Sequence, residues 1–278
     1  MIHPMRAPPP ASSPPPTALV TGASSGIGQA LAAELHTMGY RVLGTSRDPQ
    51  ARDRSVHSFL LLDAADPRDP QRFQEEHREA LLNIDVLVNN CGGGCFGDLC
   101  AHSGEAVSAG LRLLLETPMQ LTRAVLPGMR SRGGGHVVYM SSLAAVFPLP
   151  YMAVYSAAKA GLSQFAAGMQ MAEGRTGVKF LDVQAGDFRT GFNRNMARAK
   201  EMSLAEAKAW QRLEALLESG PPAGKAARDI ARAIAGKRGG RLRTGGFFQA
   251  RLAPLGARIL PHRWLLTMIR RYYRLPRG

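Results

Sequence analysis

Apolar residues of this chain fall into short continuous runs that alternate with stretches in which they recur every three or four positions. The first run, Thr17–Val20, ends at a Thr-Gly pair, and Gln29–Met38 then carries apolar residues at helical spacing. Strands separated by helices pair in parallel through right-handed crossovers. The same alternation predicts further strands over Arg41–Gly44, Phe59–Leu62, Asp85–Val88, His136–Met140, Lys179–Val183 and, more weakly, Arg241–Thr244, and helices over Arg72–Leu82, near Leu111–Met129 and over Tyr151–Met171.

The pattern indicates an α/β fold: a Rossmann-like, doubly wound parallel sheet flanked by helices. No internal repeat or interdomain linker interrupts it, so we expect a single domain over residues 17–245. The hydrophobic content of 45% is enough for a sizeable core. Residues 1–16 are proline-rich and are expected to form a disordered arm. Residues 246–278 are basic and aromatic, and we expect them to form a helical C-terminal extension.

Most of the net charge of +14 lies at the C-terminal end of the sequence. Residues 225–278 hold 14 basic residues against a single acidic one, Asp229, and so carry +13 of it. Arginines alternating with aromatic residues such as Trp264 and Tyr272 are typical of a surface for anionic membranes or for an acidic carrier protein. An arginine-rich helix that packs on the core or on another subunit explains the pattern equally well. Basicity without a recognisable motif does not indicate nucleic acid.

Composition also bears on localisation and on metal binding. No window approaches the roughly eighteen apolar residues of a spanning helix, and the N-terminal residues lack the apolar core of a secretory signal. Cys91, Cys95 and Cys100 are too few for a disulfide framework, and together with His102 they match no common zinc spacing. We therefore expect a cytoplasmic protein without a metal, and the basic extension adds the alternative of peripheral membrane association.

A glycine-rich turn separates the first predicted strand from the first predicted helix. Its sequence, Thr-Gly-Ala-Ser-Ser-Gly-Ile-Gly, permits a tight turn and lets a pyrophosphate approach the free N–H groups of the helix. A structural turn alone could explain three nearby glycines, but their place between a strand and a helix favours a dinucleotide site. The residues expected to line this site are Gly22, Ser24, Ser25, Gly26, Ile27 and Gly28.

The end of the second strand indicates which dinucleotide is bound. An acidic side chain there would accept hydrogen bonds from a ribose 2′-hydroxyl, whereas a basic one would pair with a 2′-phosphate. The chain reads Thr45-Ser46-Arg47 and has no carboxylate until Asp48. NADP(H) is therefore favoured over NAD(H), with Ser46 and Arg47 as the contacting residues.

A phenol, an amine and a hydroxyl form the candidate catalytic group. Tyr155 and Lys159 are four residues apart on a predicted helix and therefore share one face. Ser142 closes the preceding strand, thirteen residues before Tyr155. A cation beside a phenol stabilises the phenolate and lowers the phenol pKa. Taken alone, such a Tyr and Lys pair is usually a surface contact.

Together these segments resemble the short-chain dehydrogenases/reductases (SDR) of the common type, with about 250 residues. The resemblance covers about residues 17–245. Four signatures carry it in order: the glycine turn, Asp63 after the third strand, Asn89-Asn90-Cys91-Gly92 after the fourth, and Ser142 with Tyr155 and Lys159.

The resemblance implies a role for each of these residues. Tyr155 would exchange a proton with the substrate oxygen, Ser142 would hydrogen-bond that oxygen, and Lys159 would lower the Tyr155 pKa and hold the nicotinamide ribose. Asp63 would contact the adenine. Members of the family often form dimers or tetramers, so a homodimer or homotetramer is expected. The further cofactor contacts implied are Asn90, Gly92, Gly186, Phe188 and Thr190.

The chain also departs from the family pattern. The usual active-site Asn aligns with Leu114, which cannot hold the water of a proton relay to Lys159, and Leu113 and Leu115 lack a polar atom as well. The usual Pro-Gly after the sixth strand is Ala185-Gly186, which loosens the φ restriction of that loop. A catalytically weak or inactive nucleotide-binding member is therefore an alternative hypothesis.

The segment beyond Thr190 is expected to shape the substrate side, with a lid over about residues 188–222. Ser203 and Glu206 have the spacing of a capping box that opens a helix. We expect a hydrophobic substrate from the apolar side chains on this helix and near the site, although ordinary helix packing explains each of them singly. These side chains are Leu204, Ala207, Trp210, Leu213, Leu217, Phe147, Tyr151, Met152 and Met196.

The functional hypothesis is an NADP(H)-dependent oxidoreductase that reduces a ketone, or oxidises a secondary alcohol, on a small hydrophobic substrate. A reductase of carrier-bound acyl groups, docked through the basic extension, is a further alternative. A Ser/His/Asp hydrolase is not indicated, because Ser142 is not in a Gly-x-Ser-x-Gly turn.

Overall fold

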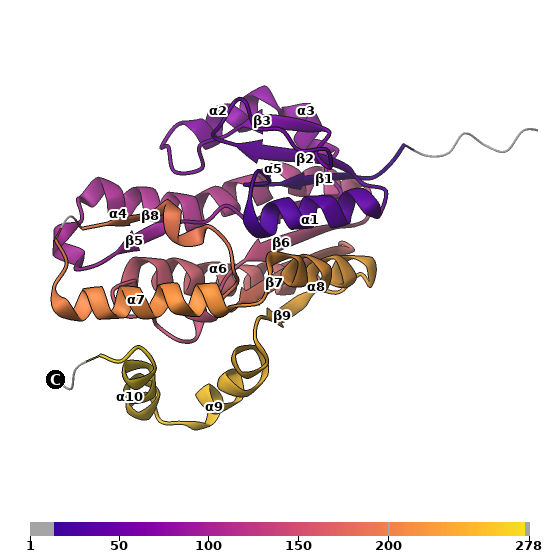
Figure 1. The fold of residues 1–278 in the computed structure, drawn as a ribbon. Helices are drawn as coiled ribbons and strands as arrows, with labels where there is room; N and C mark the ends of the chain where they lie inside the picture. Colours follow the sequence, from indigo (N-terminus) through magenta and orange to yellow (C-terminus); the bar gives the residue numbers. More distant parts are fainter. Residues whose placement is uncertain (1–13, 200, 276–278) are drawn as a thin grey trace, which may run out of the picture.

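Parallel strands form the central sheet, as the sequence pattern predicts (Figure 1). The computed structural model describes residues 14–199 and 201–275, and within them the sheet has seven strands in the order β3-β2-β1-β4-β6-β7-β9. The chain winds outward from β1 in one direction and from β4 in the other, which makes the sheet doubly wound. The strands are β1 (Thr17–Val20), β2 (Arg41–Ser46), β3 (Ser58–Leu61), β4 (Val86–Asn89), β6 (Gly135–Met140), β7 (Val178–Ala185) and β9 (Gly240–Thr244).

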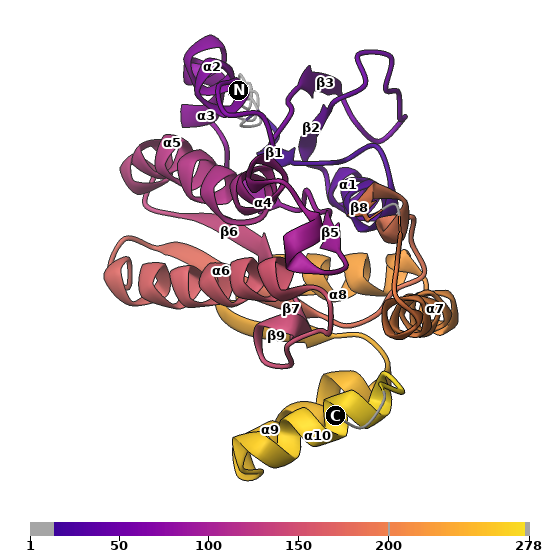
Figure 2. The ribbon, with the colours of Figure 1, turned by 90° about the vertical axis from the view of Figure 1, so that its left-hand side faces the viewer.

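Helices cover both faces of the sheet, so successive strand residues enter two separate cores. Val88 belongs to the core on one face and its neighbour Leu87 to the core on the other. Figure 2 shows the two layers on opposite sides of the strands. One layer holds α1 (Gly26–Thr37) and α8 (Ala223–Ala235), and the other holds α2 (Asp69–Glu76), α3 (Arg78–Leu82), α5 (Thr117–Ser131) and α6 (Ala153–Ala172).

Two predicted helices have different bounds in the structure. The helix expected over Arg72–Leu82 is divided into α2 and α3, because His77 leaves the helical conformation with φ −112° and ψ 20°. The helix expected from Tyr151 begins at Ala153, since Tyr151 has a φ of 59° in the left-handed region.

The helix expected near Leu111–Met129 consists of three pieces. It begins as α4 (Gly104–Leu111), passes through a π turn over Arg112–Glu116 and continues as α5. Pro118 has no N–H to donate to the carbonyl of Leu114, which accounts for the wider turn at this point.

Some elements were not among the sequence predictions. Helix α8 was missed, and so was a short parallel pair of β5 (Gly94–Phe96) and β8 (Met196–Arg198). This pair links the loop after β4 to the segment before α7 (Leu204–Ser219). Short 3₁₀ turns occupy Leu99–Ala101, Leu143–Ala145 and Phe192–Asn195.

The C-terminal extension is helical and lies beyond the β9 edge of the sheet (Figure 1). It consists of a π turn over Phe248–Leu252, α9 (Ala253–Ile259) and α10 (His262–Tyr272). At the other end, residues 14–16 are exposed and irregular, and the rest of the predicted arm lies outside the described residues. None of the helices in the described parts of the chain is long and apolar enough to cross a bilayer.

Candidate active site

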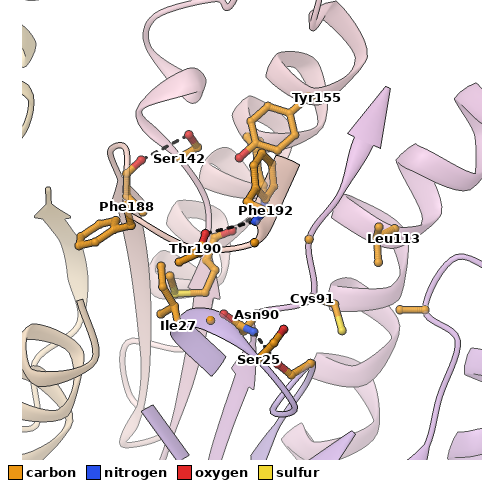
Figure 3. A pocket seen from close by; sticks show the side chains of 18 of the residues that line it. Ser25, Ile27, Asn90, Cys91, Leu113, Ser142, Tyr155, Phe188, Thr190 and Phe192 are labelled. Atoms are coloured by element: carbon orange, nitrogen blue, oxygen red, sulfur yellow. Dashed lines mark hydrogen bonds between the residues drawn. The ribbon is translucent and has the colours of Figure 1, made fainter. Parts of the chain in front are cut away.

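A cavity of about 420 Å³ lies at the carboxyl ends of the central strands, where ligands bind in doubly wound sheets. Every predicted catalytic or cofactor residue except Gly28 lines it, and Figure 3 shows several of them, among them Ser25, Asn90 and Tyr155. The structure thus brings together residues more than 160 positions apart in the chain. The predicted residues around the cavity are Gly22, Ser24, Ser25, Gly26, Ile27, Ser46, Arg47, Asp63, Asn90, Gly92, Ser142, Tyr155, Lys159, Gly186, Phe188 and Thr190.

Gly28 lies behind the glycine turn and lets the turn close. A Cβ atom at Gly28 would lie 2.3 Å from the Gly22 carbonyl oxygen and 2.4 Å from Asn90 Nδ2, so a larger residue does not fit. Asn90 itself holds the turn, because its Nδ2 donates to the Thr21 carbonyl at 2.9 Å and its backbone N–H donates to Thr21 Oγ1 at 2.8 Å. Asn90 is therefore a structural residue of the turn as well as a lining residue.

The N-terminus of α1 faces the cavity with its N–H groups available. Ser25 is the N-cap residue, with extended backbone angles, and its side chain makes no capping hydrogen bond within the described chain. The first turn of α1 carries no acidic side chain. Unbonded N–H groups and the positive end of the helix dipole favour a phosphate at this place.

Arg47 is exposed at the end of β2 and lines the same cavity. The neighbouring Asp48 carboxylate accepts the backbone N–H of Gln50 at 2.8 Å, and the Asp48 N–H donates to Ser46 Oγ at 3.0 Å. The acidic side chain is therefore bonded to its own loop. The basic side chain is the charged group nearest to the end of the strand.

The Tyr155 hydroxyl is turned toward Ser142 at one side of the cavity (Figure 3). Burial raises the pKa of Tyr155 to about 12, the Ser142 hydroxyl opposes this shift and the Asp187 carboxylate adds to it. Phe192 packs edge-to-face against the Tyr155 ring at 5.6 Å. The phenol therefore keeps its proton at neutral pH and can donate it.

Lys159 is only 4% exposed and lies beneath Tyr155. Its Nζ donates to the Met140 carbonyl oxygen at 2.6 Å and lies 5.6 Å from the centre of the Tyr155 ring. Burial lowers the pKa of Lys159 to about 8, against opposing effects of Cys91 and Asp182. Burial outweighs the other effects on Tyr155, so the net shift of its pKa is upward. The lowering of the Tyr155 pKa by Lys159 therefore stays a prediction.

Ser142 is held at the end of β6 by backbone groups. Its Oγ accepts the N–H of Ala144 at 3.0 Å and donates weakly to the Ala185 carbonyl at 3.4 Å. These bonds fix the hydroxyl in front of Tyr155.

The π turn presents leucine to the site, as the sequence alignment predicts. Leu114 is 1% exposed and packs in the apolar cluster that contains Tyr155, while Leu113 lines the cavity. Neither offers a polar atom for a water relay to Lys159.

Helix α7, which lies within the segment predicted to form a lid, packs in that same cluster through Trp210, Leu213 and Leu217. The predicted capping box of Ser203 and Glu206 is confirmed. Leu204, one of the apolar side chains from which a hydrophobic substrate was expected, is 73% exposed. The buried residue in the first turn is Glu206, whose Oε1 accepts the Asp98 N–H at 2.7 Å.

Two acidic residues in and near the site were not foreseen. Asp187 follows Gly186 in the cavity wall, and burial raises its pKa while a hydrogen bond from Gln249 opposes the shift. Asp182 is buried within β7 and accepts hydrogen bonds from the hydroxyls of Ser141 and Ser163. The acidic position inside an apolar strand was the only signal for Asp182.

Comparison with known proteins agrees with this geometry. The short chain dehydrogenase family model matches residues 16–201. A 3-ketodihydrosphingosine reductase of Bacteroides thetaiotaomicron is 34% identical over 181 residues, which cover 64% of this chain and 67% of that protein. Mouse 17-beta-hydroxysteroid dehydrogenase type 1 is 30% identical over 209 residues, 70% of this chain and 60% of that protein.

A solved structure extends the similarity beyond the matched segment. A short-chain dehydrogenase from Streptomyces avermitilis superposes with a TM-score of 0.77 at 31% identity, over 93% of this chain and 98% of that one. Members of the matched family act on small substrates and commonly form oligomers. By fold, by the order of its signatures and by the matched segment, this chain belongs to the short-chain dehydrogenases/reductases.

Proposed function

We propose that this protein is an NADP(H)-dependent oxidoreductase that reduces a ketone on a hydrophobic substrate, or oxidises the corresponding secondary alcohol. The observation that carries the proposal is the convergence of Tyr155, Ser142 and Lys159 on the cavity that the glycine turn also lines. When bound there, a nicotinamide cofactor would supply or accept the hydride.

The residues around the cavity fit such a cofactor. The turn at Gly22 and Gly28 leaves no room for a side chain, and the N–H groups of α1 favour a pyrophosphate. Arg47 would pair with a 2′-phosphate, which supports NADP(H) over NAD(H). Asp63 and Thr190 line the cavity and would contact the adenine and the nicotinamide.

The proton step is assigned to the protein's own groups. Tyr155, whose pKa is about 12, keeps its proton and gives it to the carbonyl oxygen during reduction. The Ser142 hydroxyl, which in this structure donates weakly to the Ala185 carbonyl, would turn to donate a second hydrogen bond to that oxygen. Lys159 carries a positive charge below its pKa of about 8, and this charge stabilises the phenolate left on Tyr155.

The apolar surroundings of the site support a hydrophobic substrate. Tyr155 belongs to a cluster with Met152, Met196 and the side chains of α7. The two relatives named above are, by their names, a reductase of a ketone and a dehydrogenase of a hydroxysteroid. Both names fit the proposed chemistry at a ketone or secondary alcohol.

The test is oxidation of NADPH, and of NADH in parallel, across a panel of hydrophobic ketones. We expect the wild type to prefer NADPH and Tyr155→Phe to lose turnover by at least about a hundredfold. Tyr40→Phe, half-buried between α1 and β2 and away from the cavity, is the matched control and should behave as wild type. Bound NADPH without oxidation, equal in wild type and Tyr155→Phe, would overturn the proposal in favour of an inactive nucleotide-binding protein.

We further propose that α10 attaches the protein to anionic membrane surfaces. Trp264 is 56% exposed and Met268 is 50% exposed, and Arg263, Arg270 and Arg271 are exposed on the same helix. Exposed aromatic and apolar side chains beside arginines suit a headgroup region better than an acidic carrier protein.

The membrane proposal is tested by sedimentation with vesicles. We expect binding to vesicles that contain phosphatidylserine, weaker binding at high salt, and loss of binding in the double variant Trp264→Ser and Met268→Ser. Absence of sedimentation by the full chain would reject the membrane. A salt-sensitive KM confined to carrier-bound substrates would favour the carrier instead.

A further inference from the structure

A second cavity, of about 320 Å³, lies between the C-terminal extension and the segment that carries Ser142. This volume is within the range of small-molecule sites. Its walls are formed by the loops after β6 and β7 on one side and by the π turn, α9 and α10 on the other. The aliphatic side chains around it are Leu143, Leu149, Leu260, Leu265, Met268 and Ile269.

The acidic side chain of this second cavity is already hydrogen-bonded. The Asp187 carboxylate accepts the side-chain amide of Gln249, and the Asp187 backbone N–H donates to Gln249 Oε1 at 3.1 Å. The remaining wall is mainly hydrocarbon. An apolar space of this kind binds water poorly and favours an apolar occupant.

The second cavity adjoins the reaction site. Ser142, Leu149, Ala185, Gly186 and Asp187 line both cavities. An apolar group attached to a carbonyl that is held at Ser142 can therefore extend into the second cavity. Met268 and Phe248 line the cavity and are also half-exposed, so the far end reaches the protein surface.

The C-terminal extension is held at both of its ends, so the wall that it contributes to the second cavity is fixed in place. Gln249 joins its start to Asp187, and a Cβ atom on Gly186 would lie 2.6 Å from Gln249 Oε1. At its end, Arg212 of α7 donates to the Tyr272 carbonyl at 3.1 Å and stacks on the Tyr272 ring at 5.1 Å. Leu275 packs against the cluster that contains Tyr155.

We propose that the second cavity binds the hydrocarbon chain of the ketone substrate and that the C-terminal extension makes this enzyme selective for long-chain ketones. The inference rests on the proposed reduction of a ketone and adds the substrate class and the residues that select it. The flexible aliphatic wall and the open far end suit an unbranched chain, because such a chain can bend at Ser142 and continue to the surface.

The test uses methyl ketones whose alkyl chains grow from butyl to decyl. Each methylene buried in the cavity should raise kcat/KM by up to about fourfold, until the cavity is full. Ala253→Phe and, separately, Leu260→Trp place a large ring in the cavity, and each should remove the gain for the long chains while leaving the butyl ketone unchanged. Thr267→Phe, at an exposed position of α10 outside the cavity, is the matched control.

Binding without turnover separates this inference from the proposed function. In the Tyr155→Phe background with NADPH, calorimetry should show affinity that rises with chain length and falls on Ala253→Phe. That result, without any turnover in the wild type, would contradict the reductase assignment but would still support binding of a hydrocarbon chain in the second cavity. If the affinity does not depend on chain length, or if neither cavity-filling variant changes it, binding of the chain in the second cavity is contradicted even if the protein reduces ketones.

Discussion

Replacing the buried Lys159 with methionine should make the protein more stable at neutral pH while it removes catalysis. Burial lowers the Lys159 pKa from 10.5 to about 8. Each pKa unit is worth about 1.4 kcal/mol, so the buried charge costs about 3 kcal/mol of unfolding free energy at about pH 7. Loss of the hydrogen bond to Met140 offsets about 1 kcal/mol of this. The net expected gain of Lys159→Met is about 2 kcal/mol.

The pH dependence gives the sign of the effect. The folded-state pKa lies below the unfolded one, so the unfolded state binds more protons between about pH 8 and about pH 10.5. The cost of Lys159 is therefore complete below the lower value and vanishes as the pH rises through the upper one. The advantage of the variant should shrink over that window and then reverse, because the lost hydrogen bond remains.

Urea unfolding followed by circular dichroism, at several pH values, measures this difference. Lys208→Met, at an exposed position of α7, is the matched control and should change the unfolding free energy by at most about 0.5 kcal/mol. A Lys159→Met variant that is less stable than wild type at neutral pH, or whose advantage does not change with pH, would show that burial of the Lys159 charge does not cost stability.

Four further predictions concern single positions. Gly28→Ala should abolish NADPH binding in fluorescence titrations, because its Cβ would lie 2.3 Å from the Gly22 carbonyl; binding at wild-type affinity would contradict the assigned turn. Gly128→Ala should lower the unfolding free energy by about 1 to 3 kcal/mol, since its Cβ would lie 1.8 Å from the Leu82 carbonyl, whereas Gly168→Ala on the open side of α6 should be neutral or stabilising. Arg47→Asp should weaken NADPH binding by about ten- to a hundredfold and spare NADH, with Arg54→Asp as control; equal effects on the two cofactors would remove the assignment of Arg47. The kcat/KM for reduction should fall as the pH rises through about 8, where Lys159 loses its charge; a flat profile up to about pH 10 would exclude a catalytic role for that charge.

Local patterns were sufficient for the sheet and for the placing of the nucleotide turn. Runs such as Thr17–Val20 are apolar because both faces of a parallel strand are buried, and this signal requires no knowledge of the rest of the chain. Helix α8 was missed although its apolar side chains recur at helical spacing, and its buried face consists largely of small alanines such as Ala227 and Ala231.

Features that depend on distant contacts could not be read from the sequence. Leu204 was expected among the apolar side chains near the substrate, but the buried side chain in the first turn of α7 is Glu206, which accepts the N–H of Asp98, more than 100 positions earlier. The Asp187 and Gln249 pair joins segments 62 positions apart and depends on how the extension docks. The upward pKa shift of Tyr155 likewise depends on burial by side chains from several elements.

The decisive measurement is the transfer of deuterium to a long-chain methyl ketone from NADPH that carries two deuterium atoms at C4 of the nicotinamide ring. We expect one deuterium on the carbinol carbon of the product alcohol for each NADPH consumed, and no product from Tyr155→Phe although this variant still binds NADPH. Product alcohol without deuterium, or equal label in the product of Tyr155→Phe, would contradict this expectation.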